Sequence, residues 1–217
     1  IIDGNGSTAG VKLMNQSYIT VKNIEVQNNV TNYEKNNVVQ RNGIYIGGYN
    51  GIISNIIITD CTIRNVYGTV IRPYFYDNAG INIRYNIPSD MENRFDNILI
   101  ENCLVEDVRS IGIRIGDASS GTEEDARRPY STNFVVRNTR IERTGADGMI
   151  VQSCNRPLIE YVKCFDAGYY AIPGVQYIGT ECLAGLWSCA TESPIFQFNE
   201  VARTRFIDGD GQAFDTD

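Results

Sequence analysis

The chain has 217 residues, which is enough for one large domain, and its formal net charge is −7. This acidic balance argues against a nucleic-acid partner, and the chain contains no run of about 18 apolar residues that would span a membrane. Histidine is absent, which excludes histidine-based triads, imidazole general bases and histidine metal sites.

Two kinds of short segment alternate along the chain. The first is a β-branched run that in most cases closes on Asn or Asp: ITVKN (19–23), IIITD (56–60), ILIEN (98–102), FVVRN (134–138), LIEYV (158–162) and IFQFN (195–199). The second starts with glycine: GIYIGG from Gly43, GINIRY from Gly80, GIRIGD from Gly112, GMIVQS from Gly148, GLWSCA from Gly185 and GQAFDT from Gly211. Apolar residues recur at every second position in both kinds, which predicts β-strands.

The interval between these segments predicts a solenoid. Successive β-branched runs begin 37, 42, 36, 24 and 37 residues apart. Many short strands at a variable interval, without a helical stretch, are typical of a coil that turns once per repeat and stacks on itself. We therefore predict an all-β parallel β-helix of about six to seven coils, forming one domain over residues 1–217.

Stacking brings equivalent residues of successive coils together. One corner is predicted to carry a ladder in which each side-chain amide bonds its neighbour, interrupted at Val162; its members are Asn23, Asp60, Asn102, Asn138 and Asn199. Cys61 and Cys103 also occupy matching positions, with Cα atoms about 4.8 Å apart. That spacing is within disulfide reach, but parallel stacked side chains have poor bridge geometry, so two buried free thiols are favoured.

The other cysteines stand at positions 154, 164, 182 and 189, and no C-x-x-C pair occurs, which disfavours a zinc ribbon. The segments 84–97, 116–133 and 168–183 are rich in turn formers and charge, and are predicted to leave the solenoid as loops. These loops either form the walls of a groove or are insertions that the fold tolerates without a role in binding. Both ends fall in mid-coil without a capping helix, so we expect a piece of a longer chain whose open edges pair with a partner or self-associate.

This pattern resembles the right-handed parallel β-helix of the pectate-lyase-like superfamily over almost the whole chain. A narrower likeness lies in the last third: residues 145–168, 184–201 and 210–217 look like segments of bacterial β-helix proteins assigned to polysaccharide degradation. The resemblance implies a polysaccharide or oligosaccharide ligand and a secreted, periplasmic or cell-surface location. It does not choose a reaction, because this fold hosts hydrolases, lyases, epimerases and adhesive tailspikes.

Strand alternation assigns one outer face of the glycine-led segments. Aligned on the glycines, the outward positions carry the candidate site residues. The candidate catalytic carboxylates are Asp147, Asp210, Asp215 and Asp217, and the candidate substrate-binding residues are Asn82, Arg84, Arg114, Gln152, Trp187 and, from the following turn, Glu192. Carboxylates supply acid and base, and an indole ring offers a flat apolar surface to a sugar.

Each candidate also has a purely structural interpretation. Trp187 can pack under a loop, and Arg84 and Arg114 can neutralise acids of the insertions. Asp147 and Asp210 each precede a glycine and can be ordinary turn residues, as can Glu192.

Two reactions and one binding role remain open at this point. A glycoside hydrolase needs two carboxylates, and Asp215 and Asp217 on one strand would have Cα atoms about 6.7 Å apart. A polysaccharide lyase would use Arg84 or Arg114 as base, with Ca²⁺ on the aspartates. A binding or adhesive β-helix would need no acid cluster. We favour the hydrolase. The alternatives are a lyase that binds Ca²⁺ as its cofactor and a non-catalytic glycan-binding or adhesive β-helix.

Short motifs add little to this choice. The sequence "DTD" at 215–217 is similar to the "NTD" of polygalacturonases, but Asp replaces Asn and the Gly-His-Gly of that family is missing. The stretch "DGDGQ" at 208–212 looks like the start of an EF-hand loop without the glycine at the sixth position.

Overall fold

The computed structural model describes residues 1–30, 39–49, 51–69, 77–85, 93–116, 130–170, 183–205 and 211–216. Their strands form three sheets, named A, B and C here. Sheet A contains β1 (Ile2–Asp3), β4 (Glu25–Asn28), β7 (Thr62–Val66), β10 (Leu104–Val108), β13 (Arg140–Thr144), β17 (Lys163–Phe165) and β20 (Glu200–Ala202). Sheet B contains β2 (Ala9–Met14), β5 (Asn42–Gly48), β8 (Ala79–Tyr85), β11 (Ile111–Ile115), β14 (Met149–Gln152), β18 (Ala184–Cys189) and β21 (Gln212–Thr216).

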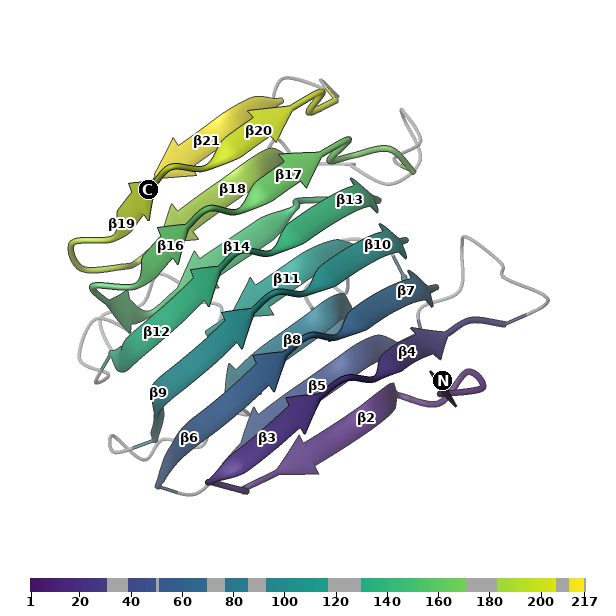
Figure 1. The fold of residues 1–217 in the computed structure, drawn as a ribbon, viewed down its shortest axis with the longest axis horizontal. Helices are drawn as coiled ribbons and strands as arrows, with labels where there is room; N and C mark the ends of the chain where they lie inside the picture. Colours follow the sequence, from purple (N-terminus) through teal and green to yellow (C-terminus); the bar gives the residue numbers. More distant parts are fainter. Residues whose placement is uncertain are drawn as a thin grey trace.

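Sheet C contains β3 (Ile19–Lys22), β6 (Ile52–Thr59), β9 (Arg94–Glu101), β12 (Ser131–Arg137), β16 (Leu158–Glu160) and β19 (Ile195–Gln197), with β15 (Cys154–Asn155) paired to β12. Neighbouring strands are parallel throughout, and the chain visits B, C and A in turn. In Figure 1 it runs from left to right along sheets C and A, returns behind them along sheet B, and rises one coil, which is a right-handed path. The predicted right-handed parallel β-helix is confirmed.

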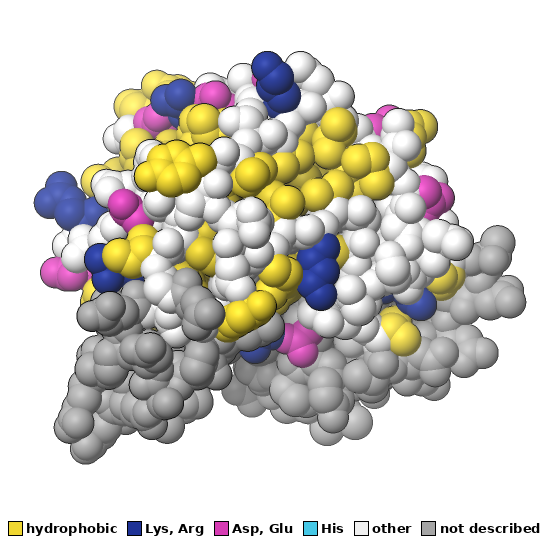
Figure 2. Space-filling model, turned by 90° about the horizontal axis from the view of Figure 1, so that it is seen from below, with side chains coloured by type: hydrophobic (Ala, Val, Ile, Leu, Met, Phe, Trp, Pro, Cys, Tyr) yellow, Lys and Arg dark blue, Asp and Glu magenta, His cyan; other side chains and the backbone are white. Residues whose placement is uncertain are grey.

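Within the described residues, no helix has the length and apolar character needed to cross a bilayer. Apolar side chains instead fill the bore of the solenoid. Residues in equivalent positions stack, as in the sheet B column Ile44, Ile81, Ile113, Met149 and Leu186, all of which are buried. Full burial of such a side chain stabilises the fold by about 1.5–3 kcal/mol. Figure 2 views the stack from the end at which β2 and β3 lie, where hydrophobic side chains form a band across the face.

A glycine column explains why one kind of segment starts with glycine. The column consists of Gly10, Gly43, Gly80, Gly112, Gly148 and Gly185. A Cβ added at any of them would lie 2.1–2.6 Å from a side-chain atom of sheet A, and 2.4–3.1 Å from the carbonyl oxygen of the next coil. Sheets A and B approach so closely at this corner that even a methyl group does not fit.

A second kind of corner requires left-handed backbone. Asn23, Asp60, Asn102 and Asn138 follow sheet C with φ of 50–54°, and their N–H groups donate to carbonyls of the next coil. Asn and Asp tolerate this conformation better than other non-glycine residues. Among the described residues, however, no side-chain hydrogen bond joins two members of this column. The predicted amide ladder is therefore wrong, although its first four residues do occupy equivalent corner positions.

The last two positions of that column are also corrected. Tyr161 and Phe198 occupy the left-handed corner, with φ of 53° and 56°, and their rings stack with centroids 5.1 Å apart. Asn199 lies one position later, where its Oδ1 accepts from the N–H of Val162 at 2.8 Å. An amide ladder does exist within sheet C, where Asn97 Nδ2 donates to Asn55 Oδ1 at 2.7 Å.

The matching of Cys61 and Cys103 on successive coils is confirmed by the bond from Leu104 N–H to the Cys61 carbonyl. Both are buried free thiols, as are Cys154 and Cys164, while Cys189 is a partly exposed free thiol. Cys182 lies outside the described residues.

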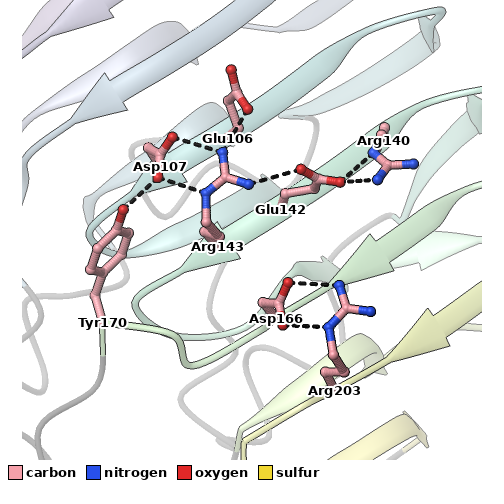
Figure 3. Close-up of polar contacts among 8 residues, drawn as sticks. All are labelled: Glu106, Asp107, Arg140, Glu142, Arg143, Asp166, Tyr170 and Arg203. Carbon is pink, nitrogen blue, oxygen red and sulfur yellow. Dashed lines mark hydrogen bonds and ion pairs between the residues drawn. The ribbon is translucent and has the colours of Figure 1, made fainter.

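The outer face of sheet A carries an alternating charge column, shown in Figure 3. Arg143 donates to both oxygens of Asp107, at 2.9 and 2.8 Å, and also contacts Glu106 and Glu142. Tyr170 donates its hydroxyl to Asp107. Hydrogen bonds from Arg143 hold the pKa of Asp107 below its usual range, and Arg203 does the same for the pKa of Asp166.

The corner column yields a first prediction. Asn138 is exposed and has φ of 50°, so Asn138→Val places a β-branched residue in left-handed backbone without changing the core. We expect it to lower the free energy of unfolding by about 1–3 kcal/mol, whereas Asn138→Gly changes it by less than about 0.5 kcal/mol. Urea denaturation followed by circular dichroism measures both. Equal stability of the Val and Gly variants would contradict the backbone explanation.

The charge column yields a second prediction. Because its pKa is lowered on folding, Asp107 contributes stability that is complete above its unfolded pKa of about 3.9 and is lost as the pH falls through its folded pKa. Asp107→Asn keeps a residue that tolerates φ of 54° and removes the charge. We expect it to cost about 1–2 kcal/mol at pH 7, and less at pH 2.

Thermal unfolding at both pH values, with Asp60→Asn as control, measures this effect. Asp60 sits at a left-handed corner with φ of 54° and makes no ion pair among the described residues. A loss for Asp107→Asn that is the same at both pH values would refute the ionic explanation.

Candidate active site

The candidate residues lie on the outer face of sheet B, which faces backward in Figure 1. The central outward column of this face runs Lys12, Tyr45, Asn82, Arg114, Ile150, Trp187 and Asp215 in paired register. A second outward column, two residues further along each strand, contains Met14, Gly47 and Arg84 on one side and Gln152 and Cys189 on the other. The predicted face is therefore confirmed for the first five of its six segments, from Gly43 to Gly185, and β2 extends it by one strand.

The last strand is shifted by two residues from the sequence alignment. β21 pairs Trp187 with Asp215 and Ala184 with Gln212, so Ala213, not Gly211, takes the glycine position. The alignment on Gly211 was wrong, but a shift of two preserves which side chains face outward. Asp215 consequently lies directly beside Trp187, about 4.8 Å away along the sheet, and its side chain is partly exposed.

Trp187 is not an open platform in this structure. Only 6% of it is exposed, and it belongs to an outer-face cluster with Ala79, Ile111, Ala146, Ile150 and Ala184. Its indole Nε1 is buried and has no hydrogen-bond partner among the described residues. A buried donor without an acceptor is costly, and a ligand oxygen could reach it only if the side chains that bury it moved.

Gln152 and Arg114 form a buried polar pair on the same face. Arg114 Nη2 donates to Gln152 Oε1 at 3.2 Å, and Arg114 is fully buried. Gly116 makes this packing possible, because a Cβ there would lie 1.8 Å from the Gln152 carbonyl oxygen. Arg114 lies three strands from Asp215, a distance of about 14 Å. At this distance Arg114 cannot act as a base beside that aspartate, and its contacts fit a structural role.

Asp147 is separated from Asp215 as well. It is 1% exposed, and its Oδ1 accepts from the N–H of Ala184 at 2.8 Å. Two strands and three residues lie between Asp147 and Asp215, a Cα separation of about 14 Å. This is well beyond the roughly 5–9.5 Å between paired glycosidase carboxylates, so Asp147 does not fit as the partner of Asp215.

Two further candidates, Arg84 and Asn82, lie on the same face but far from Asp215 along the stack. Arg84 is paired with Asp77 and stands four strands from Asp215, about 19 Å. Asn82 is buried and donates to Asn42 Oδ1 at 3.0 Å. The sequence interpretation placed all of them in one groove because it assigned the face without measuring distance along the stack.

Glu192 is not on this face. It is exposed, forms a bridge with Asn155, and accepts from Asn155 Nδ2 at 2.6 Å. Its interpretation as an ordinary turn residue is the one that fits these contacts.

Asp208, Asp210 and Asp217 lie outside the described residues. Across the part of the chain that the structure describes, no group of three or more Asp, Glu, Cys or His side chains has the arrangement of a metal site.

What the sequence interpretation missed is the burial of the outer face. Its signal was present in the apolar outward residues Ala79, Ile111, Ile150 and Ala184.

Comparison with known proteins gives a consistent likeness. No protein-family model matches the chain. The chain is 28% identical over 262 aligned positions to a lacto-N-biosidase of Bifidobacterium longum subsp. longum, an alignment that covers 94% of this chain and 16% of that enzyme.

Solved structures of similar fold include the crystal structure of the GH136 lacto-N-biosidase from Eubacterium ramulus. Its native form has a TM-score of 0.79 and 22% identity, covering 96% of this chain and 38% of the solved one. The selenomethionine derivative has a TM-score of 0.74 and 19% identity, covering 91% and 43%. These likenesses support the β-helix fold, and this chain spans less than half the length of the proteins that it matches.

The contacts of Asp147 yield a third prediction. Asp147→Ala leaves the buried Ala184 N–H without its acceptor and should lower the free energy of unfolding by at least about 1–3 kcal/mol. Asp147→Asn retains an oxygen at the same position and should lose less. Denaturant midpoints of both variants test this, and equal losses would show that the charge, not the hydrogen bond, is what the fold requires.

Proposed function

We propose that the protein is a glycoside hydrolase that acts on an oligosaccharide, of the lacto-N-biosidase type. The observation that carries this proposal is the sequence similarity to a lacto-N-biosidase along 94% of the chain. The likeness in fold to a GH136 lacto-N-biosidase supports it independently of the sequence alignment.

We assign the central catalytic role to Asp215. Its carboxylate lies on the outer face, partly exposed, beside the indole ring of Trp187. Two residues further along, Asp217 would share its face if the strand continued, at a Cα separation of about 6.7 Å. One carboxyl group protonates the departing oxygen while the other attacks as nucleophile or activates water. Asp210 is the alternative partner.

Trp187 is proposed to orient the sugar rather than to react. Its buried Nε1–H lacks an acceptor among the described residues, and a sugar hydroxyl would supply one if the ring turned outward when the sugar binds. Elimination by an arginine base is disfavoured, because Arg84 is held by Asp77 and Arg114 is buried about 14 Å from Asp215.

This assignment yields a fourth prediction, tested in the full-length protein. Asp215→Asn and Asp217→Asn preserve size and remove charge, and each should lower kcat by at least about 100-fold, the low end of what one general acid or base contributes. The assay is release of nitrophenol from the nitrophenyl glycoside of lacto-N-biose. Asp60→Asn, the same change at an exposed corner on another side of the solenoid, is the control and should leave kcat unchanged.

If both aspartate variants keep near-normal turnover, the cluster is structural and the mechanism is wrong. If the wild-type protein releases no nitrophenol but generates unsaturated products from an acidic glycan, an elimination reaction replaces the hydrolysis proposed.

A further inference from the structure

A polar cavity lies on the same face of sheet B but toward its other end. Its volume is about 350 Å³, and the described residues that line it are Thr8, Lys12, Met14, Gln40, Tyr45, Asp77 and Arg84. Cavities of 300–1,000 Å³ with a few converging polar groups are typical of small-ligand sites. Tyr45 stands five strands from Asp215, about 24 Å, so this cavity is separate from the proposed catalytic aspartates.

The cavity is built on a buried hydrogen-bonded base. Asn42 is fully buried, and its Nδ2 donates to the carbonyl oxygens of Thr8 and Asp77, at 3.2 Å each. Its Oδ1 accepts from Ala79 N–H at 2.9 Å and from Asn82 Nδ2 at 3.0 Å. One side chain therefore fixes residues on two sides of the cavity before any ligand binds, which lowers the entropic cost of binding.

The described residues of the lining carry more positive than negative charge. Two of them are cations, Lys12 and Arg84, and one is an anion, Asp77, so these residues sum to +1 (two minus one), whereas the whole chain carries −7. Asp77 pairs with Arg84. Lys12 is exposed and has no acidic partner among the described residues; its Nζ lies 5.8 Å from the ring centroid of Tyr45.

Arg84 retains unused donor capacity. Its Nη1 contacts Asp77, but its Nε is buried and has no hydrogen-bond partner in the described part of the chain. Gly47 lies opposite Arg84 on the neighbouring strand, and a Cβ there would come within 2.6–2.8 Å of the Tyr45 ring and the Met14 thioether. The cavity thus combines two cations, an aromatic ring and a thioether with the hydroxyl and amide groups of Thr8 and Gln40.

We propose that this cavity binds a carboxylate-bearing sugar, such as a sialic or uronic acid, at a site distinct from the catalytic aspartates. Lys12 and the partly exposed guanidinium group of Arg84 recognise the carboxylate. Thr8 and Gln40 recognise hydroxyl groups, and Tyr45 with Met14 contacts the apolar side of the ring. The inference rests on the proposed function for the choice of a sugar as ligand, while the choice of an anion rests on the lining alone.

Binding is tested directly in the full-length protein carrying Asp215→Asn, which prevents turnover. Isothermal titration compares sialyllactose, glucuronic acid, lactose and acetate. We expect sialyllactose or glucuronic acid to bind and lactose to bind at least about tenfold more weakly, and we expect the tighter interaction to weaken as NaCl rises from 50 to 500 mM. Lys12→Gln should raise the Kd of the acidic sugar at least about fivefold, equivalent to about 1 kcal/mol.

Lys22→Gln is the matched control, because Lys22 is an exposed lysine on sheet C and should leave the Kd unchanged. Gly47→Ala tests the steric arrangement and should also weaken the acidic sugar, with its fold checked by circular dichroism. Equal binding of lactose and sialyllactose, or no effect of Lys12→Gln, would overturn the proposal, and acetate binding as tightly as the sugars would reveal an adventitious ion only. Nitrophenol release by the wild-type protein is measured separately. Its failure would count against the proposed hydrolase activity and would not affect the measured binding of the acidic sugar.

Discussion

In-register parallel stacking is the constraint on which the rest of this structure depends. Each strand pairs with its own equivalent one coil away, about 4.8 Å along the stack, so every side chain meets the side chains of the same position. Isoleucines stacked on isoleucines fill the bore without conflict. Like charges stacked in this way repel each other. One column of sheet A alternates its charges, Asp107 with Arg143 and Asp166 with Arg203, and where Glu106 stacks on Glu142 the same Arg143 donates to both.

The corners explain how much of the fold could be predicted from the sequence. Close approach of sheets A and B admits only a hydrogen at the glycine column, and left-handed backbone after sheet C favours Asn or Asp. Because of these two requirements, Gly and Asn or Asp recur in the sequence and identify the repeat. These residue types are misleading markers where a different residue occupies the same position. Tyr161 and Phe198 take the left-handed corner, and their rings stack. Ala213 takes a glycine position in β21, at the end of sheet B, where it is exposed and no further described strand packs on it. Counting Asn and Gly therefore misplaced those coils by one and by two residues.

The sequence predicted on which side of sheet B the candidate side chains lie, but not how deeply they are buried. Alternation fixed which side chains leave sheet B outward, and that assignment survived even the wrong register of β21, because a shift of two residues keeps the face. Trp187 is buried among other outward apolar residues of this face, and Arg114 is fully buried, whereas alternation gives only the direction of a side chain. Distance along the stack was, by contrast, available from the sequence: the number of coils between Arg84 and Asp215, multiplied by the strand spacing, already separates them by about 19 Å.

Burial between the two ends of this face bears on how ligands would occupy it. Asn82 and Arg114 occupy the same outward column as Tyr45 and Asp215 and lie between them, and both are fully buried. A glycan chain therefore has no open path along this column from the cavity at Tyr45 to the aspartate, because displacing buried, hydrogen-bonded side chains would leave polar groups unpaired. An acidic sugar in the cavity would then belong to a separate branch or a separate molecule, not to subsites continuous with the scissile bond. The β-helix supplies the reason: each coil adds an independent outward position, so one face can carry chemically different sites at a fixed separation.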